Sequence, residues 1–214
     1  MSSTNAIISL TSWKARITTV GLTLFSLLKW CPGFRIVLCL STEEFPGKED
    51  ELPNDLRAML SAGLFEILWT GKNVKSFKKW IFTAQRYPTI PIISADDDCI
   101  YQRNYANELY QAWIKNPLCC YTIHKCPVSG FQHGPATLYP PGVASNFMIE
   151  HLTENVLRTA HDDVFYGMCL NKLNIPIIEI SRTVPYVFHD TTGALSDGIT
   201  MNLFKSMTII SHEI

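Results

Sequence analysis

The chain has 214 residues, of which 47% are apolar and 17% are charged. These proportions are typical of a compact globular domain and exclude a disordered chain, a collagen and a coiled coil. Eighteen basic residues against nineteen acidic residues give a formal net charge of −1, whereas a protein that binds nucleic acid usually carries a clustered basic excess. We therefore expect a single domain, 1–214, with no nucleic-acid partner.

The apolar segments of the chain predict neither a secretory signal nor a membrane span. The first residues do not place a basic region before an apolar core of about 7–15 residues, as a signal peptide would. The apolar stretch 20–40 is interrupted by Lys29, Pro32, Gly33 and Arg35, and a membrane helix needs about 20 consecutive apolar residues. The seven cysteines include no C-x-x-C pair, which favours reduced thiols in the cytoplasm over a disulfide framework.

The first half of the chain alternates short apolar runs with stretches of helical spacing. Strands are predicted over 6–10, 35–40, 64–68 and 90–95, with helices over 20–28, 53–62 and 76–86 between them. Such an alternation predicts right-handed β-α-β units in an α/β fold, whose mostly parallel central sheet is flanked by helices.

The second half of the chain has a looser pattern. Helices are predicted over 103–116, 149–160 and 163–173, with strands over 118–123 and 176–180. The stretch 127–143 is rich in glycine and proline, which predicts a β-hairpin or a substrate loop beside the sheet.

Three consecutive carboxylates, Asp96, Asp97 and Asp98, follow the strand 90–95, which we expect in the centre of the sheet. Open α/β sheets bind their ligands at the carboxyl ends of the strands. Adjacent carboxylates repel one another unless a cation neutralises them, and Mn²⁺ or Mg²⁺ prefers such oxygen ligands. The alternative is a solvated acidic turn, but few such turns follow a buried apolar strand so directly. The triplet therefore predicts a divalent metal site.

Two polar segments are candidates for binding a phosphorylated ligand. Thr11, Ser12 and Arg16 lie in the turn between the first strand and the first helix, where backbone donors suit phosphate. Arg16 is equally compatible with a surface salt bridge. Lys78 and Lys79 lie near the start of a predicted helix, where the helix dipole disfavours cations unless an anion is close. A diphosphate is such an anion, and two lysines on a solvated helix face are the alternative.

The segment HDDVFYG places Asp162 and Asp163 at the start of the last long helix. A structural explanation suffices for this position, because Asp is a favoured N-cap and acidic residues suit the first turn. In a functional interpretation, one carboxylate caps the helix while the other, partly buried beside it, has a raised pKa and acts as a base.

Four segments together resemble the nucleotide-sugar-dependent glycosyltransferases of the GT-A fold, especially small bacterial enzymes of surface-polysaccharide assembly. They are IISLTSWKARI, KSFKKW, IISADDDCIY and HDDVFYG, and the resemblance spans 7–167. It implies a metal-dependent transfer of a sugar, such as a hexose, from a nucleotide-diphosphate sugar to a hydroxyl of a saccharide or lipid-linked acceptor. The donor it favours is a UDP-sugar. Residues 1–98 would bind the donor and 99–214 the acceptor, and a peripheral association with the inner face of the membrane stays open.

The resemblance also implies which residues bind the metal and the donor. Asp96 and Asp98 would form an Asp-x-Asp pair that binds Mn²⁺ or Mg²⁺, with His189 as a third ligand. The residues that would contact the donor are Thr11, Arg16, Lys78, Asp96 and Asp97.

In the inverting members that the chain resembles, an acidic pair followed by glycine supplies the base. Asp163 would be this base here, and Asp162 would cap the helix or orient its neighbour. His133, Asn146 and Phe147 would lie on the acceptor side. An inverting outcome depends on this assignment, and the choice between inverting and retaining stays open.

Two other functions share part of this pattern. A phosphatase of the haloacid dehalogenase type also places aspartates after a strand, but its motif has a threonine two residues beyond the second aspartate and normally sits on the first strand. Here Ile100 occupies that position, and the triplet follows the fourth strand. A non-catalytic sugar-binding protein of the same fold is the other alternative.

Overall fold

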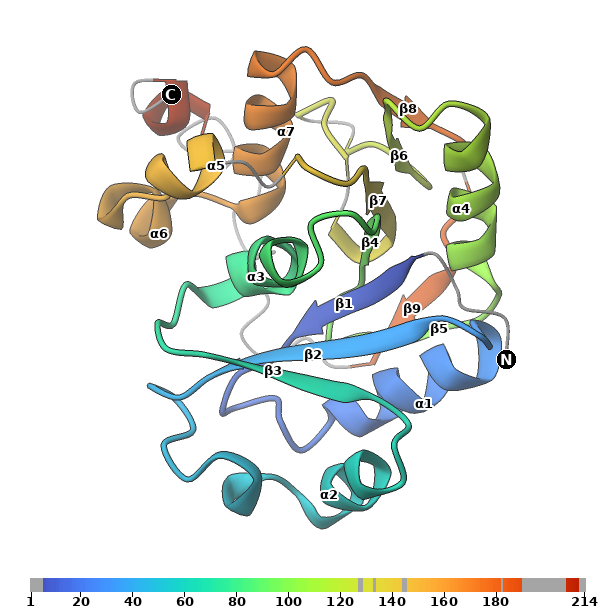
Figure 1. Ribbon diagram of the computed structural model, residues 1–214, viewed down its shortest axis with the longest axis vertical. Coiled ribbons are helices and arrows are strands. Elements are labelled where there is room, and N and C mark those ends of the chain that lie inside the picture. Colours follow the sequence, from blue (N-terminus) through green and yellow to red (C-terminus); the bar gives the residue numbers. More distant parts are fainter. Residues whose placement is uncertain are drawn as a thin grey trace.

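The computed structural model describes residues 6–126, 129–132, 134–143, 146–181, 183–189 and 207–211. Its centre is a seven-stranded sheet with the order β3-β2-β1-β4-β7-β6-β8, and a separate two-stranded sheet pairs β5 with β9 (Figure 1). The strands are β1 (Ile7–Thr11), β2 (Arg35–Ser41), β3 (Glu66–Thr70), β4 (Ile92–Ser94), β5 (Cys99–Tyr101), β6 (Cys120–Thr122), β7 (Thr137–Tyr139), β8 (Ile177–Glu179) and β9 (Tyr186–Phe188). The helices are α1 (Val20–Trp30), α2 (Asn54–Ser61), α3 (Lys78–Arg86), α4 (Tyr105–Lys115), α5 (Asn146–Glu150), α6 (Glu154–Thr159) and α7 (Asp162–Lys172). None of the described helices is both long and apolar enough to cross a membrane.

The strands β3, β2, β1 and β4 are parallel and form the half of the sheet that the alternating pattern predicts. β4 is the fourth of the seven strands, so the acidic triplet follows the central strand as expected. Ser9 of β1 lies opposite Ser94 of β4, and Thr11 lies opposite Cys39 of β2. The segments that follow these three strands therefore leave the sheet at the same edge.

The glycine- and proline-rich stretch joins the antiparallel strands β6 and β7, as the hairpin alternative predicts, but it enters the central sheet and does not lie beside it. Part of it, β7, is a strand inside the central sheet, antiparallel to both β4 and β6. All three residues of β7 are buried, so packing on both faces stabilises a strand too short to stand out in the sequence. The other pairings of the central sheet are parallel, which confirms the prediction of a mostly parallel α/β fold.

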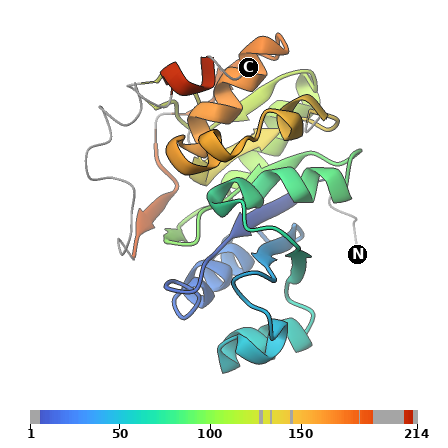
Figure 2. The ribbon, with the colours of Figure 1, turned by 90° about the vertical axis from the view of Figure 1, so that its left-hand side faces the viewer.

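Helices cover both faces of the central sheet. α1 and α3 lie on opposite sides of it in both views (Figure 1, Figure 2). The core on the side of α1 includes side chains of α2 and α4, and the core on the other side includes side chains of α3 and α7. Trp80 of α3 stacks on Tyr139 of β7 with ring centroids 4.1 Å apart, and Tyr166 of α7 meets Trp80 edge-on at 4.5 Å. This aromatic packing holds the first turns of α3 and α7 on the same face.

The helix predicted over 149–160 is two helices in the structure, α5 and α6. Thr153 separates them and is the N-cap of α6, where its side chain accepts a hydrogen bond from the backbone N–H of Val156. A capping box would have Glu or Gln three residues after Thr153, but this position is Val156. The sequence therefore indicates the break between the two helices only weakly. The sequence does not predict the small sheet of β5 and β9. Its first strand, β5, begins at Cys99, directly after the acidic triplet.

Candidate active site

Five carboxylates and two cations meet where β1, β4 and the first turns of α3 and α7 come together. They form two ion-paired groups, and the three aspartates of the acidic triplet are divided between these groups. The Arg16 group consists of Ser12, Arg16, Asp97 and Asp98. The Lys79 group consists of Lys79, Asp96, Asp162 and Asp163.

The Arg16 group joins the loop after β1 to the end of β4. Arg16 Nη1 donates to Asp97 Oδ1 at 2.7 Å and to Asp98 Oδ2 at 2.9 Å, and the Ser12 hydroxyl donates to Asp97 Oδ2 at 2.6 Å. Arg16 is buried, so it is not the surface salt-bridge residue that the sequence alone allows. The structure instead places it against the triplet, where it pairs with two of the protein's own carboxylates.

The single guanidinium of Arg16 does not balance the charges of both Asp97 and Asp98. Burial raises the pKa of Asp97 even though Ser12 and Arg16 stabilise its charged form. Burial and repulsion from Asp96 raise the pKa of Asp98 to about 6, against the opposing effect of Arg16. Both carboxylates are thus held in a site that disfavours their ionised form until further positive charge arrives.

The Lys79 group places one ammonium among three carboxylates. Lys79 Nζ lies 2.8 Å from Asp96 Oδ1, 2.9 Å from Asp162 Oδ2 and 3.9 Å from Asp163 Oδ1. Burial opposes the charge of Lys79, but attraction to the three carboxylates raises its pKa well above the usual value. Lys79 is therefore a fixed positive charge at the start of α3, and the anions that the helix dipole requires there are the protein's own carboxylates.

The two carboxylates at the start of α7 differ in protonation. Burial opposes the charge of Asp162, but Lys79 lowers its pKa below the usual value. Burial and the neighbouring charge of Asp162 raise the pKa of Asp163 to about 7. Asp163 keeps 27% of its side chain exposed, and its Oδ1 has no hydrogen-bond partner among the described residues. This geometry suits a group that exchanges a proton near neutral pH.

The expected helix cap at Asp162 is wrong. The N-cap of α7 is His161, whose side chain makes no capping hydrogen bond, and Asp162 is the first residue of the helix. The reason is the ion pair with Lys79, which directs the Asp162 carboxylate toward α3. The Asp162 carboxylate is therefore held by Lys79 and not by the helix end, and its orienting role stays a prediction.

Gly134 lies against both members of the Lys79–Asp163 pair. A Cβ atom at this position would lie 2.5 Å from Lys79 Nζ and 2.7 Å from Asp163 Oδ1. The Gly134 carbonyl is held by the Ser94 hydroxyl at 2.5 Å. A residue with a side chain would displace the ammonium and the carboxylate, so the site requires glycine here.

Tyr101 connects the triplet to the segment that contains Gly134. Its hydroxyl donates to the carbonyl of Pro135 at 2.7 Å and accepts from the backbone N–H of Asp96 at 3.1 Å. Tyr101 stacks on Tyr105 with ring centroids 4.7 Å apart. The unpredicted strand β5 thus fixes the direction in which the triplet leaves the sheet.

The other candidate residues for the donor and the metal are Thr11, Lys78 and His189. The Thr11 hydroxyl donates to the carbonyl of Cys39 at 2.7 Å, at the end of β2. Lys78 is not brought to the triplet, because its buried ammonium binds Glu44 at 2.9 Å and the Asn73 side chain at 2.5 Å.

His189 adjoins the triplet through the main chain. Its backbone N–H donates to the carbonyl of Asp98 at 2.9 Å, and its ring Nε2 lies 3.1 Å from the Thr23 hydroxyl. Among the described residues, no group of three or more His, Cys, Asp or Glu side chains is arranged so that it could hold a metal ion. The role of His189 as a third ligand stays a prediction. His133 and the side chain of Asn146 lie outside the described residues.

The chemistry of the donor set, though not its present arrangement, suits a hard divalent cation. The two groups contain five carboxylates against two cations, and all five supply oxygen, which Mn²⁺ and Mg²⁺ prefer. Asp96 and Asp98 keep 28% and 12% of their side chains exposed, so both can be reached from solvent. Burial and repulsion from Asp96 raise the pKa of Asp98, so a cation bound beside it would favour its ionised form.

Comparison with known proteins gives structural matches alone. Neither a protein-family model nor a curated protein matches the sequence. A putative glucose-1-phosphate thymidylyltransferase from Bacillus anthracis matches with a TM-score of 0.55 and 11% identity, over 94% of each chain. A 4-diphosphocytidyl-2C-methyl-D-erythritol synthase matches with a TM-score of 0.52 and 9% identity, over 92% of this chain and 95% of the other.

A mannosyltransferase from Pyrobaculum calidifontis, solved with GDP-Man and Mn²⁺, matches with a TM-score of 0.51 and 14% identity. The match covers 83% of this chain but 55% of the mannosyltransferase, so the chain spans about half of that protein. These identities support a conclusion about the fold alone. The protein has the GT-A-like fold that glycosyltransferases and nucleotidyltransferases share.

Proposed function

We propose that the protein is a metal-dependent glycosyltransferase that moves a sugar from a nucleotide-diphosphate sugar to a hydroxyl group of an acceptor. The observation that carries this proposal is the cation deficit at the carboxyl end of the central strand, with five carboxylates around two cations. In an open α/β sheet this edge is where ligands bind. A divalent cation would supply the missing positive charge, and it would also bind the diphosphate of the substrate.

Asp96 and Asp98 are the residues that would hold Mn²⁺ or Mg²⁺, with His189 as a candidate third ligand. The metal would supply positive charge that stabilises the departing diphosphate. Arg16, fixed by Asp97, is positioned to bind the donor from the loop after β1. Thr11 lies at the same edge of the sheet, at the end of β1. Lys78 would contact the diphosphate only if its ammonium left its present ion-pair partner, Glu44.

Asp163 is the proposed base that accepts the proton of the attacking hydroxyl. Its pKa of about 7 lets it be unprotonated in neutral solution and still take up a proton during the reaction. Lys79 keeps Asp162 ionised, and the charge of Asp162 in turn helps to raise the pKa of Asp163. If the hydroxyl activated by this base attacks the sugar on the face opposite the leaving diphosphate, a single displacement inverts the configuration of the sugar.

The donor is proposed to be a UDP-sugar, and the acceptor a saccharide or a lipid-linked saccharide. The mannosyltransferase neighbour was solved with a nucleotide sugar and Mn²⁺, which supports the class of donor but not its base. Residues 1–98 contribute the Arg16 group and Asp96, whereas α7 of the second half contributes the base. This division supports a donor half and an acceptor half.

Thermal unfolding with a panel of nucleotide sugars tests the proposal. A donor at a hundred times its Kd should add about 2.7 kcal/mol to the free energy of unfolding. We expect this gain for a UDP-sugar with Mn²⁺ and a much smaller one without the metal. If no nucleotide sugar stabilises the protein in either condition, the proposed donor site is wrong.

A nucleotidyltransferase is the second candidate, because the thymidylyltransferase match covers 94% of both chains. Such an enzyme would release pyrophosphate from a nucleoside triphosphate, whereas a glycosyltransferase would release UDP from a UDP-sugar. Measuring both products with Mn²⁺ separates the two. A non-catalytic sugar-binding protein would release neither, and a phosphatase would prefer simple phosphate esters.

A further inference from the structure

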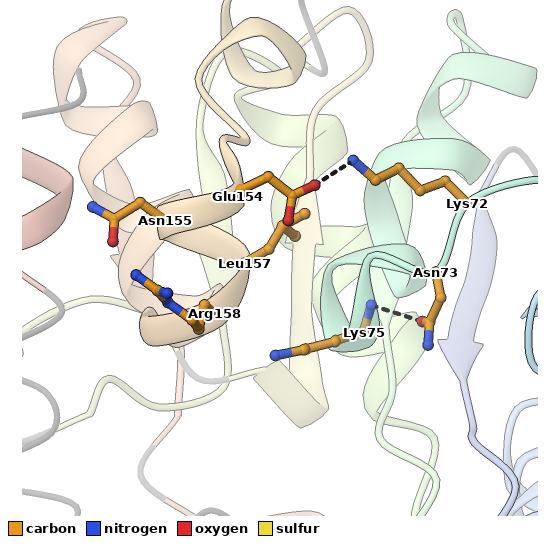
Figure 3. Close-up of a pocket in the computed structure, with 7 residues that line it drawn as sticks. All are labelled: Lys72, Asn73, Lys75, Glu154, Asn155, Leu157 and Arg158. Carbon is orange, nitrogen blue, oxygen red and sulfur yellow. Dashed lines mark hydrogen bonds and ion pairs between the residues drawn. The ribbon is translucent and has the colours of Figure 1, made fainter.

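A pocket of about 550 Å³ lies between the loop that connects β3 to α3 and the helix α6 (Figure 3). The loop contributes Lys72, Asn73 and Lys75, and α6 contributes Glu154 and Arg158. Three of these residues carry a positive charge and one a negative charge, whereas the whole chain has a formal net charge of −1. The pocket is therefore a local concentration of positive charge on a nearly neutral protein.

An ion pair at the rim joins the two walls of the pocket. Lys72 Nζ lies 3.0 Å from Glu154 Oε1, and both side chains are largely exposed. An exposed pair of this kind contributes little to stability, so Lys72 is able to turn to an incoming anion. Figure 3 shows that the side chain of Lys75 extends from the loop toward α6, where Arg158 lies.

The loop wall is held in an unusual backbone conformation. Lys75 has a φ of +53°, which residues other than glycine seldom adopt. The Asn73 side chain stabilises it by accepting a hydrogen bond from the backbone N–H of Lys75 at 3.0 Å and another from Lys78 Nζ at 2.5 Å. Backbone strain of this kind gathers at binding sites, where it directs a side chain to a ligand.

Both walls continue into the elements that carry the Lys79 group. The loop leads into α3, whose second residue is Lys79, and α6 is followed within a few residues by Asp162 and Asp163 at the start of α7. Short stretches of chain therefore connect the two walls of the pocket to Lys79 and to the proposed base Asp163, which under the proposed function would meet the acceptor.

We infer that this pocket binds a phosphate group of the acceptor, an inference that rests on the proposed transferase function. A phosphate monoester carries a charge of about −1.5 to −2 at pH 7, which matches the formal excess of two positive charges better than a carboxylate does. Arg158 offers the planar donor pair that recognises phosphate in a bidentate manner. Lys72 and Lys75 supply charge from the opposite wall.

Calorimetric titration of inorganic phosphate into the metal-free full chain tests this inference. Lys75→Ala with Arg158→Ala should weaken phosphate binding about tenfold or more, because each removes a charge-assisted contact to the anion. The matched control is Arg57→Ala with Lys115→Ala, which removes the same charge from exposed positions outside the pocket. Undetectable binding to the natural protein, or equal binding to the two double variants, overturns the inference.

A second variant keeps the test decisive if the first does not fold. Glu154→Gln removes the negative charge from the rim, so it should strengthen phosphate binding, and unchanged or weaker binding speaks against the pocket. Vesicles of phosphatidylcholine with and without phosphatidic acid identify the source of the phosphate. Binding to phosphatidic acid that depends on Lys75 and Arg158 indicates a lipid-linked acceptor, whereas binding of inorganic phosphate alone indicates a soluble one.

Donor hydrolysis distinguishes a failure of the pocket from a failure of the proposed function. Lys75 and Arg158 lie outside the catalytic machinery, so their double variant should hydrolyse a UDP-sugar with Mn²⁺ as the natural protein does. If the natural protein hydrolyses no nucleotide sugar but binds phosphate through these two residues, the pocket stands and the transferase function falls. If hydrolysis is present and phosphate binding does not depend on them, the function stands and the pocket falls.

Discussion

The Arg16 group and the Lys79 group each pair one cation with two or three aspartates, yet the pKa values of these aspartates are shifted differently. In the Arg16 group, one guanidinium contacts two carboxylates, and the pKa of each is raised above its usual value. In the Lys79 group, the ammonium lowers the pKa of Asp162. The Oδ1 atom of Asp163 lies 3.9 Å from Lys79 Nζ, and the pKa of Asp163 is raised to about 7. Burial acts in the same direction on all four carboxylates, so the position of the cation decides the difference.

Under the proposed function, this contrast gives the carboxylates different tasks. Both groups hold more carboxylates than cations, and Asp98 of the Arg16 group with Asp96 of the Lys79 group would hold the metal ion. In the Lys79 group the pKa of Asp162 is lowered and that of Asp163 is raised to about 7, which suits proton transfer by Asp163.

The largest effect is expected from Asp163→Asn, which removes the titrating member of the Lys79 group. The rate of sugar transfer should fall by about 10² to 10⁴, the usual contribution of a general base, while the affinities for UDP and Mn²⁺ stay nearly unchanged. Transfer by the natural protein should also decline as the pH falls below about 7, where Asp163 becomes protonated. Initial rates across pH 5 to 9, compared with the exposed control Asp50→Asn, measure both effects. A variant that retains the full rate excludes Asp163 as the base.

Lys79→Met should have the next largest effect, on stability. It leaves Asp96, Asp162 and Asp163 without their shared cation, and breaking a buried ion pair from one side costs about 3–5 kcal/mol. Lys78→Met is the matched control on the next residue, because its partner Glu44 is partly exposed and regains water, so we expect a loss of about 1–3 kcal/mol. Urea denaturation at pH 7 measures both.

A double variant identifies the cause of this loss. Adding Asp162→Asn to Lys79→Met removes the carboxylate that depends most on the ammonium, so part of the lost free energy of unfolding should return. If the double variant is less stable than Lys79→Met by the full cost of Asp162→Asn alone, the two residues are not coupled.

A smaller and opposite effect is expected from Asp98→Asn in the metal-free protein. The pKa of Asp98 is raised to about 6 in the folded state, so the folded protein binds more protons than the unfolded chain between about pH 4 and 6, and ionisation destabilises it as the pH rises through this range. Removing the charge should therefore stabilise the protein by about 1–3 kcal/mol above pH 6, with no gain below pH 4. Thermal midpoints at pH 4 and pH 7 in a chelator, with Asp50→Asn as control, decide this.

Gly134→Ala should have the smallest effect on stability but a specific one on turnover. The added methyl group would displace the Lys79 ammonium and the Asp163 carboxylate, both at the ends of flexible side chains that can shift at low cost. We expect a lower transfer rate with nearly unchanged UDP affinity. An equal loss of binding and rate would mean that Gly134 supports the donor site.

Much of the fold follows from the sequence, because β1 to β4 and the helices between them have strong apolar runs and clear helical spacing. The placement of Asp96, Asp97 and Asp98 after the central strand follows from the same pattern. β4, β6 and β8 are equally short but lie within longer apolar runs, whereas the central position of β7 and the β5-β9 sheet depend on tertiary packing that no periodic signal announces.

The site was harder to predict than the fold for a related reason. Lys78 and Lys79 are adjacent in the sequence, and they differ only in the direction in which the helix turns them. Trp80 packs on Tyr139 and Tyr166, and this packing decides that Lys79 and not Lys78 meets the carboxylates. The close approach of Gly134 depends on the same long-range contacts, so one glycine among eleven gave no local signal.

Calorimetric titration of UDP with and without Mn²⁺ measures whether the carboxylates after β4 hold the metal, using the natural protein, Asp98→Asn and the control Asp50→Asn. Mn²⁺ should strengthen UDP binding to the natural protein and to the control, and this gain should disappear in Asp98→Asn while the variant stays folded. If folded Asp98→Asn keeps the full gain from Mn²⁺, the carboxylates at the end of the central strand do not hold the metal, and the proposed mechanism is wrong.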